Sequence, residues 1–150
     1  MRAYVLVNSA LSGIQKGLQA GHALVEMAMD ARTKNARSAV FNEWAVSHKT
    51  MIVLEGGYHA GLEAAKAALE AALGGKDELP WTAFYEDEET MNGMLTAVAV
   101  VVPERLWDAP RNGDMDPEVA PDLLDEVEYP TLKPWEAHVM RILAGRSLAR

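Results

Sequence analysis

The sequence predicts an α/β fold in which a four-stranded mixed, mainly parallel sheet lies between helices. Short, nearly continuous apolar stretches alternate with segments of helical periodicity. The stretches are rich in β-branched residues and end at glycine, proline or polar turns. Strands that are apolar along their whole length are typical of largely parallel sheets, because helices cover both faces of such sheets.

The elements are expected in the order βααβαββ. Residues 2–7 read as a buried strand, and a helix follows from Ile14 to about Asp30, opened by a capping box of Ser12 and Gln15. Glycine pairs mark the end of the second strand and of the alanine-rich third helix. The remaining expected elements are a helix over 38–46, a strand over 50–54, a helix over 59–73 and strands over 81–85 and 95–102.

Three parts are expected along the chain. Residues 1–103 hold all four strands and form an α/β domain. Residues 104–134 form an acidic, proline-rich extension with few large apolar side chains. Residues 135–150 regain helical spacing and predict a C-terminal helix, whose Trp135 we expect to pack on the domain.

The first expected helix carries two stripes at helical spacing. The apolar stripe, which we expect to face the core, comprises Ile14, Leu18, Gly21, Val25 and Ala28. The polar stripe comprises Gln15, Gln19, His22 and Glu26. A helix that only covers a sheet needs the apolar stripe alone, so the polar stripe indicates a site near the strand-to-helix turn.

Composition narrows the class of protein. Apolar residues make up 49% and charged residues 24%, as in ordinary globular domains. No apolar run approaches the ~20 residues that cross a bilayer, and the N-terminus has a strand pattern rather than a signal-peptide core. Without cysteine there is no disulfide or thiolate chemistry, and the histidines lack metal-ligand spacing. We therefore expect a cytoplasmic protein with no membrane segment, metal or cofactor.

Charge is distributed unevenly. The net charge is -8, which argues against non-specific binding to nucleic acid. Residues 1–66 nevertheless hold seven Lys/Arg and five Asp/Glu, whereas the acidic excess lies entirely in residues 67–150. A basic face on the first half of the chain remains open.

Several residues together suggest a family. The segment Lys16–Ala23, KGLQAGHA, follows a strand and a loop, and its Gln-x-x-His-Ala spacing resembles the signature of the type II (archaeal and eukaryotic) peptidyl-tRNA hydrolases. The resemblance covers residues 2–103. Glu86-x-x-x-Thr90 stands where that family has Asp-x-x-x-Thr, and Trp44 and Lys49 lead into the second strand as they do there. One departure is that Gln15 stands at the position of the family's catalytic lysine, with Lys16 one residue later.

The resemblance implies an esterase that cleaves the ester between a peptide and tRNA by attack of water, without metal. It implies catalytic roles for Lys16, Glu86 and Thr90, with tRNA contacted through the basic first half. Substrate-binding roles fall to Asn8, Gln19, His22 and Lys49. The alternative is a binding module on the same fold, without hydrolysis, for a nucleotide, a nucleic-acid end or a protein. The displaced lysine and the net charge of -8 favour that alternative. The oligomeric state stays open, a homodimer included.

Most of these residues also have a purely structural interpretation. Lys16 fits a solvated surface lysine, and Gln15 fits a helix cap. His22 fits a histidine paired with Glu26 one turn later. Glu86 lies in a run of four acidic residues, which is typical of a solvated turn.

Overall fold

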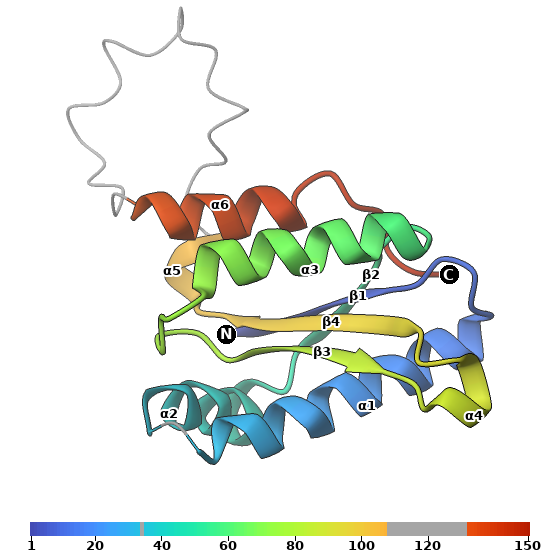
Figure 1. Ribbon diagram of the computed structural model, residues 1–150. Helices are drawn as coiled ribbons and strands as arrows, with labels where there is room; N and C mark the ends of the chain where they lie inside the picture. Colours follow the sequence, from blue (N-terminus) through green and yellow to red (C-terminus); the bar gives the residue numbers. More distant parts are fainter. Residues whose placement is uncertain (34, 108–131) are drawn as a thin grey trace, which may run out of the picture.

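The computed structural model describes residues 1–33, 35–107 and 132–150. It contains one four-stranded sheet with helices on both faces (Figure 1). The strands lie side by side in the order β2-β1-β4-β3. Their bounds are Arg2–Val7 for β1, Met51–Glu55 for β2, Trp81–Tyr85 for β3 and Leu95–Val102 for β4.

The sheet is mixed, but its pairing is not mainly parallel. β1 pairs with β2 in parallel, whereas β4 is antiparallel to both of its neighbours, β1 and β3. Three strands therefore run the same way, yet only one of the three pairs is parallel. The reason is the short connection over 86–94, which holds only the small helix α4 (Glu88–Met91). A connection this short returns the chain beside the strand it has left, in the opposite direction.

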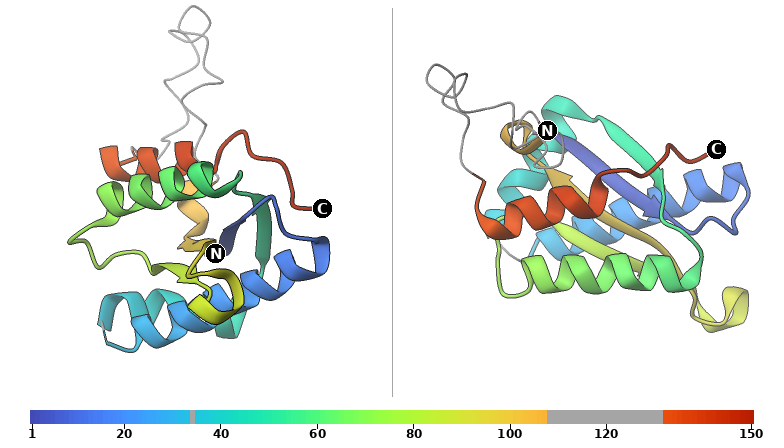
Figure 2. Two further views of the ribbon diagram at one scale, coloured as in Figure 1. Left: turned by 45° about the vertical axis from the view of Figure 1, so that its right-hand side comes forward. Right: turned by 90° about the horizontal axis from the view of Figure 1, so that it is seen from above.

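Two helical layers enclose the sheet (Figures 1 and 2). Helices α1 (Gly13–Ala31) and α2 (Asn35–Glu43) lie on one face, and α2 continues into a π-helical turn, η1 (Trp44–His48). Helices α3 (His59–Leu73) and α6 (Pro134–Leu143) lie on the other face. No helix in the described part of the chain is long and apolar enough to cross a membrane.

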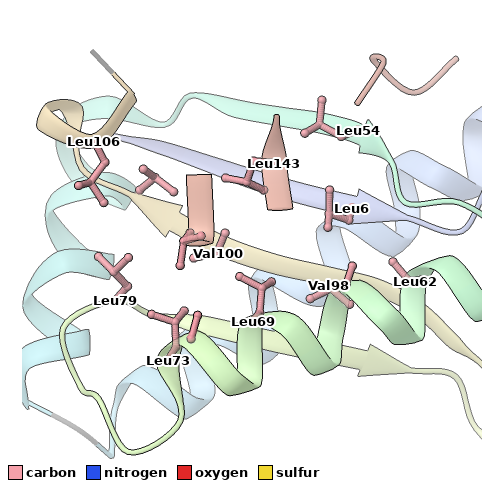
Figure 3. Close-up of a cluster of buried hydrophobic side chains, with 14 of the residues drawn as sticks. Leu6, Leu54, Leu62, Leu69, Leu73, Leu79, Val98, Val100, Leu106 and Leu143 are labelled. Atoms are coloured by element: carbon pink, nitrogen blue, oxygen red, sulfur yellow. The ribbon is translucent and has the colours of Figure 1, made fainter. Parts of the chain in front are cut away.

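Residues on the two sheet faces form two cores. Toward α3 and α6 the core is built mainly from leucines of the helices and from leucines and valines of the strands (Figure 3). Helix α6 contributes Val139 and Leu143 to this core, and Trp135 packs against it. Toward α1 the strands present alanines and valines, which meet Ala20, Ala23 and Met27 of the helix.

The predicted core face of α1 is wrong. Ile14 is 89% exposed, Val25 65% and Leu18 55%, so the larger apolar side chains point away from the sheet. The buried residues of α1 are Lys16, Gln19, Ala20, Ala23, Met27 and Ala31, of which Ala20, Ala23 and Met27 pack on the alanine- and valine-covered sheet. This buried face is neither of the two predicted stripes and shares only Gln19 with the polar one.

The end of the chain differs from the expectation as well. The last helix ends at Leu143 rather than continuing toward the terminus, and Gly145 turns the chain with a φ of 74°. Of the expected acidic extension over 104–134, residues 108–131 lie outside the described residues. Residues 104–107 form the short helix α5 (Glu104–Trp107).

A buried carboxylate holds α5 and α6 together. Glu136 is fully buried, forms an ion pair with the guanidinium of Arg105, and accepts the backbone N–H of Lys133 at 2.8 Å. Burial alone would raise the pKa of Glu136, but these two hydrogen bonds outweigh it and lower the pKa. The pair fixes the position of α6 and so of the segment that follows it.

Candidate functional site

Polar side chains meet where the strands of the sheet end, at the side that we call the carboxyl edge of the sheet. The carboxyl ends of β1, β2 and β3 lie at this edge, and the reversed direction of β4 brings its amino end to the same place. Helix α1 begins beside it (Figure 1). We name these residues the edge cluster: Asn8, Ser9, Lys16, Gln19, Glu55, Glu86 and Thr96.

Lys16 lies inside the edge cluster and is not a solvated surface lysine. Its residue is only 7% exposed, and its Nζ lies 2.6 Å from Oε1 of Glu55. Oε2 of Glu55 accepts the hydroxyl of Ser9 at 2.6 Å. The hydrogen bonds from Lys16 and then from Ser9 lower the pKa of Glu55, so this carboxylate is charged and paired with the ammonium.

Gln19 joins α1 to β3 and β4. Its Nε2 donates to Oε1 of Glu86, and its Oε1 accepts the hydroxyl of Thr96 at 3.0 Å. With Gln19 only 4% exposed and Thr96 fully buried, the amide has a fixed orientation. Gln19 therefore positions the Glu86 carboxylate from the helix side.

Asn8 shapes the turn that leaves β1. Its backbone N–H donates to the carbonyl of Thr96 at 2.9 Å, and its Oδ1 accepts the N–H of Ala10 at 2.9 Å. Its Nδ2 lies 3.8 Å from Sδ of Met94. Asn8 is 1% exposed, so within the edge cluster it serves as a buried residue that holds the turn.

His22 lies one turn beyond Gln19 on α1. Its ring packs against Phe84 with the ring centroids 5.0 Å apart. Its Nδ1 is buried and has no hydrogen-bond partner among the described residues. Gln15, by contrast, completes the capping box with Ser12 and so has the predicted capping role.

Thr90 and Lys49 lie outside the edge cluster. Thr90 is exposed in α4, where its N–H donates to Oδ1 of Asp87 at 2.7 Å and its side chain also bonds this carboxylate. Both bonds lower the pKa of Asp87, so the contact is a helix cap. Lys49 lies before the first residue of β2, at the opposite end of the strand from Glu55, with a φ of 55°.

Two basic residues of the first half, Arg37 and Lys49, lie away from the edge cluster. Arg37 is buried, where it bonds Asp30 at 3.0 Å and the carbonyl of Lys76 at 2.9 Å. It follows the far end of α1, and the 19 residues of that helix span about 28 Å. Among the lysines and arginines between 16 and 49, the edge cluster thus includes Lys16 but neither Arg37 nor Lys49.

The segment after α6, residues 146–150, crosses the outer edge of β2; we name it the C-terminal segment. The N–H of Glu55 donates to the carbonyl of Ser147 at 2.9 Å, and the N–H of Ala149 donates to the carbonyl of Val53 at 3.0 Å. Its last residue, Arg150, contacts the ion pair. The Arg150 carbonyl accepts Nζ of Lys16 at 3.3 Å, and the Arg150 N–H donates to Glu55 Oε1 at 3.4 Å.

A depression of ≈ 670 Å³ lies at this place, lined by Glu55 and by residues 147–150. Glu55 therefore borders open space on the side of the C-terminal segment, whereas Lys16 is not among the lining residues. In the described residues no group of three or more His, Asp or Glu side chains is arranged to hold a metal ion.

Sequence reasoning missed Glu55, Thr96 and the C-terminal segment. Glu55 carries the one signal that was available, because an acidic residue ends an otherwise apolar strand just before Gly56-Gly57. A carboxylate at the carboxyl end of a strand is a candidate site residue in sheets of this kind. The C-terminal segment has no such signal, since a single bridge to an edge strand leaves no periodicity.

No family model matches this chain, and no curated protein sequence matches it. The arrangement must be interpreted from its own chemistry. It offers an ammonium held beside a carbonyl oxygen and, from the next turn of the same helix, a carboxylate held by an amide.

Proposed function

We propose that the chain is an esterase of the peptidyl-tRNA hydrolase type, which cleaves the ester between a peptide and the terminal ribose of tRNA. One observation carries the proposal. Lys16 Nζ, held by Glu55, donates to the backbone oxygen of Arg150, the last residue of the sequence, at 3.3 Å. A cation that bonds a carbonyl oxygen stabilises the negative charge that develops there when water attacks the carbon.

The proposed reaction is a direct hydrolysis. Water attacks the ester carbonyl carbon, and Glu86, positioned by Gln19, takes the proton from the water. Lys16 stabilises the oxyanion. The bond from the carbonyl carbon to the ribose oxygen then breaks, and the ribose oxygen takes up the proton from Glu86. Lys16 and Gln19 are three residues apart on α1, so the two halves of the arrangement share one helix face.

The position of Lys16 supports its role despite the displacement from the family pattern. Gln15, at the family's lysine position, is exposed and caps α1. The side chain of Lys16 points inward to Glu55 at the sheet edge. Thr90 caps α4 in this chain, so Glu86 alone is assigned the role of positioning and deprotonating the attacking water.

A second function, a binding module without hydrolysis, has its own support. Glu55 neutralises the charge of Lys16, and Arg37 and Lys49 lie away from the edge cluster. Phosphate contacts supply much of the affinity for nucleic acid, so this arrangement weakens the case for tRNA. Such a module would hold a carbonyl or carboxylate group at Lys16 and leave it unchanged.

Turnover of diacetyl-lysyl-tRNA by purified protein separates the two functions. We expect Lys16→Met to lower kcat by about 10²–10³, the usual effect of removing one oxyanion donor. Glu86→Gln should lower kcat by about 10²–10⁴ through loss of the general base. Lys49→Met, which removes a lysine at the opposite end of β2, serves as the matched control and should match the wild type.

Two results would count against the proposal in different ways. No turnover by the wild type at micromolar enzyme would refute the esterase and leave the binding module. Turnover that survives both Lys16→Met and Glu86→Gln would keep the reaction but show that these residues do not carry it.

A further inference from the structure

The C-terminal segment contacts the edge cluster through its backbone, as a bound peptide would. β2 is an edge strand of the sheet, with β1 on its inner side. On its outer side Leu54 forms an antiparallel bridge with Leu148. Edge strands bind extended peptides in this way, by backbone hydrogen bonds.

We infer that the outer edge of β2, together with Lys16 and Glu55, binds the peptide part of the substrate, and that residues 147–150 occupy this site in the free protein. The inference rests on the proposed function, because it places the reacting carbonyl at Lys16. It adds the class of ligand, an extended peptide whose last carbonyl is the one attacked. It also adds a regulatory role for residues 147–150, which we call the strap and which must leave before the substrate binds.

The contacts of Arg150 show how one residue of such a ligand would be held beside Lys16. The N–H of Arg150 donates to Glu55 Oε1 at 3.4 Å and its carbonyl accepts Lys16 Nζ at 3.3 Å. The two charged groups thus hold both polar groups of one residue. A peptidyl ester bound in the same register has its ester carbonyl on the ammonium.

Most contacts of the segment with the strand are made by its backbone. The bonds from Val53 and Glu55 involve only main-chain atoms and Leu148 is 65% exposed, while the small side chain of Ala149 packs against the core on the α1 side. A site of this kind accepts peptides of varied sequence. Nascent peptides on tRNA vary in sequence, so the site and the proposed substrate agree in chemistry.

A pair of proline substitutions tests the inference in the full chain. Ala149→Pro removes the N–H that bonds Val53 and places the proline ring against that carbonyl, so the strap should detach. Leu148→Pro is the matched control. In an antiparallel bridge of this geometry the N–H of Leu148 points away from β2, and the control keeps both backbone bonds.

The probe is the fluorescein-labelled pentapeptide Arg-Ser-Leu-Ala-Arg, measured by fluorescence anisotropy. A tethered segment competes at an effective concentration on the order of millimolar. Ala149→Pro should therefore bind the probe at least about tenfold more tightly than the wild type, and Leu148→Pro should match the wild type. A pentapeptide of alanine should bind similarly. The probe with an N-methylated alanine, which lacks the donor to Val53, should not bind.

The inference is refuted if Ala149→Pro and Leu148→Pro bind the probe equally, or if N-methylation has no effect; the segment is then only a cover for the strand edge. Should Ala149→Pro fail to fold, the wild type still decides. Millimolar probe should displace the segment and shift the backbone amide resonance of Ala149, which then loses its bond to Val53, and an unchanged Ala149 resonance would refute the site. If the probe binds as expected but no variant hydrolyses diacetyl-lysyl-tRNA, the peptide site stands and the esterase falls. Hydrolysis without probe binding gives the opposite result.

Discussion

Lys16 Nζ and Glu55 Oε1 lie 2.6 Å apart and link two segments that are 39 residues apart in the sequence. The ion pair joins the first turns of α1 to the end of β2. It also sets the electrostatic state of the site, because the ammonium that is proposed to act on the substrate is held by a carboxylate of lowered pKa. Stability and activity at this edge should therefore depend on the same charge.

The first prediction concerns the pH dependence of stability. The pKa of Glu55 is lower in the folded protein than its ordinary value of 4.5, mainly through the hydrogen bond from Lys16. A carboxyl group with a lowered folded pKa stabilises the fold above its unfolded pKa, and this stabilisation is lost as the pH falls through the folded pKa. The Tm difference between wild type and Glu55→Gln should be largest near pH 7 and should shrink below pH 4.5.

Differential scanning calorimetry of both proteins from pH 7 to pH 3 provides the measurement. A Tm difference that stays constant over this range would mean that the charge of Glu55 contributes nothing to stability, and that its hydrogen bonds alone explain the pair.

The second prediction concerns the α5–α6 contact. The Arg105 side chain is 49% exposed, whereas the Glu136 side chain is fully buried, so the two partners are not equivalent. Arg105→Met leaves a buried carboxylate without its counter-ion and should lower the free energy of unfolding by about 3–5 kcal/mol. Glu136→Gln leaves an arginine that reaches water and should cost only about 1–2 kcal/mol.

Urea unfolding at pH 7 measures both variants. In Arg105→Met, burial should raise the pKa of Glu136, so this variant should recover part of its lost stability at pH 5. Equal losses for the two variants would contradict the assignment of the buried partner.

The third prediction uses two glycines with opposite surroundings. A Cβ at Gly17, on the outer face of α1, meets nothing within 4 Å. Gly17→Ala should therefore stabilise the protein by about 0.5–1 kcal/mol, the difference in helix propensity. A Cβ at Gly56 would lie 2.6 Å from Cδ1 of Leu62 and 2.8 Å from the carbonyl of Val7, so Gly56→Ala should destabilise it.

Thermal unfolding of the two variants beside the wild type provides the check. A loss of stability in Gly17→Ala would show that the outer face of α1 is covered in solution.

The fourth prediction tests the orientation of α1. Ile14 and Leu18 are exposed, so Ile14→Gln and Leu18→Gln should each change the free energy of unfolding by less than about 0.5 kcal/mol. Met27 is fully buried against the sheet, and Met27→Ala should cost about 2–5 kcal/mol. Urea unfolding gives all three values, and large losses at Ile14 and Leu18 with none at Met27 would reverse the orientation.

Local features were the ones predictable from sequence. The helix over 59–73 and the strands over 81–85 and 95–102 have the predicted bounds, since alanine periodicity, glycine pairs and β-branched runs are local signals. The antiparallel pairing of β3 with β4 could have been predicted, because a nine-residue connection is too short for a parallel crossover. The position of β4 between β1 and β3 depends on the tertiary fold and was not predictable in the same way. The buried face of α1 was missed because Ala20, Ala23 and Met27 belong to neither predicted stripe, and only the alanine- and valine-covered surface of the sheet favours them over the larger apolar residues.

The same distinction applies to the edge cluster. Lys16, Gln19 and Glu86 stood out by type and position in the sequence, and the fold brings all three to one edge. Their partners, Glu55 and Thr96, come from strands whose neighbours are set by the tertiary fold. Lys49 resembled the family pattern because it precedes the second strand. It therefore lies at the amino end of β2, whereas the edge cluster lies at the carboxyl end.

The short connection between β3 and β4 has a mechanical consequence for the site. Glu86 is held in two ways. Its backbone N–H donates to the carbonyl of Met94 at the other end of the connection, and its carboxylate accepts Nε2 of Gln19. At the other side of the sheet, the outer edge of β2 is covered by the C-terminal segment, which makes two main-chain hydrogen bonds to it. The Glu86 side of the edge cluster is thus fixed by the β3–β4 connection, whereas the β2 side is covered by a segment that can be displaced. Any ligand that enters should displace residues 147–150 and leave the Glu86 side where it is.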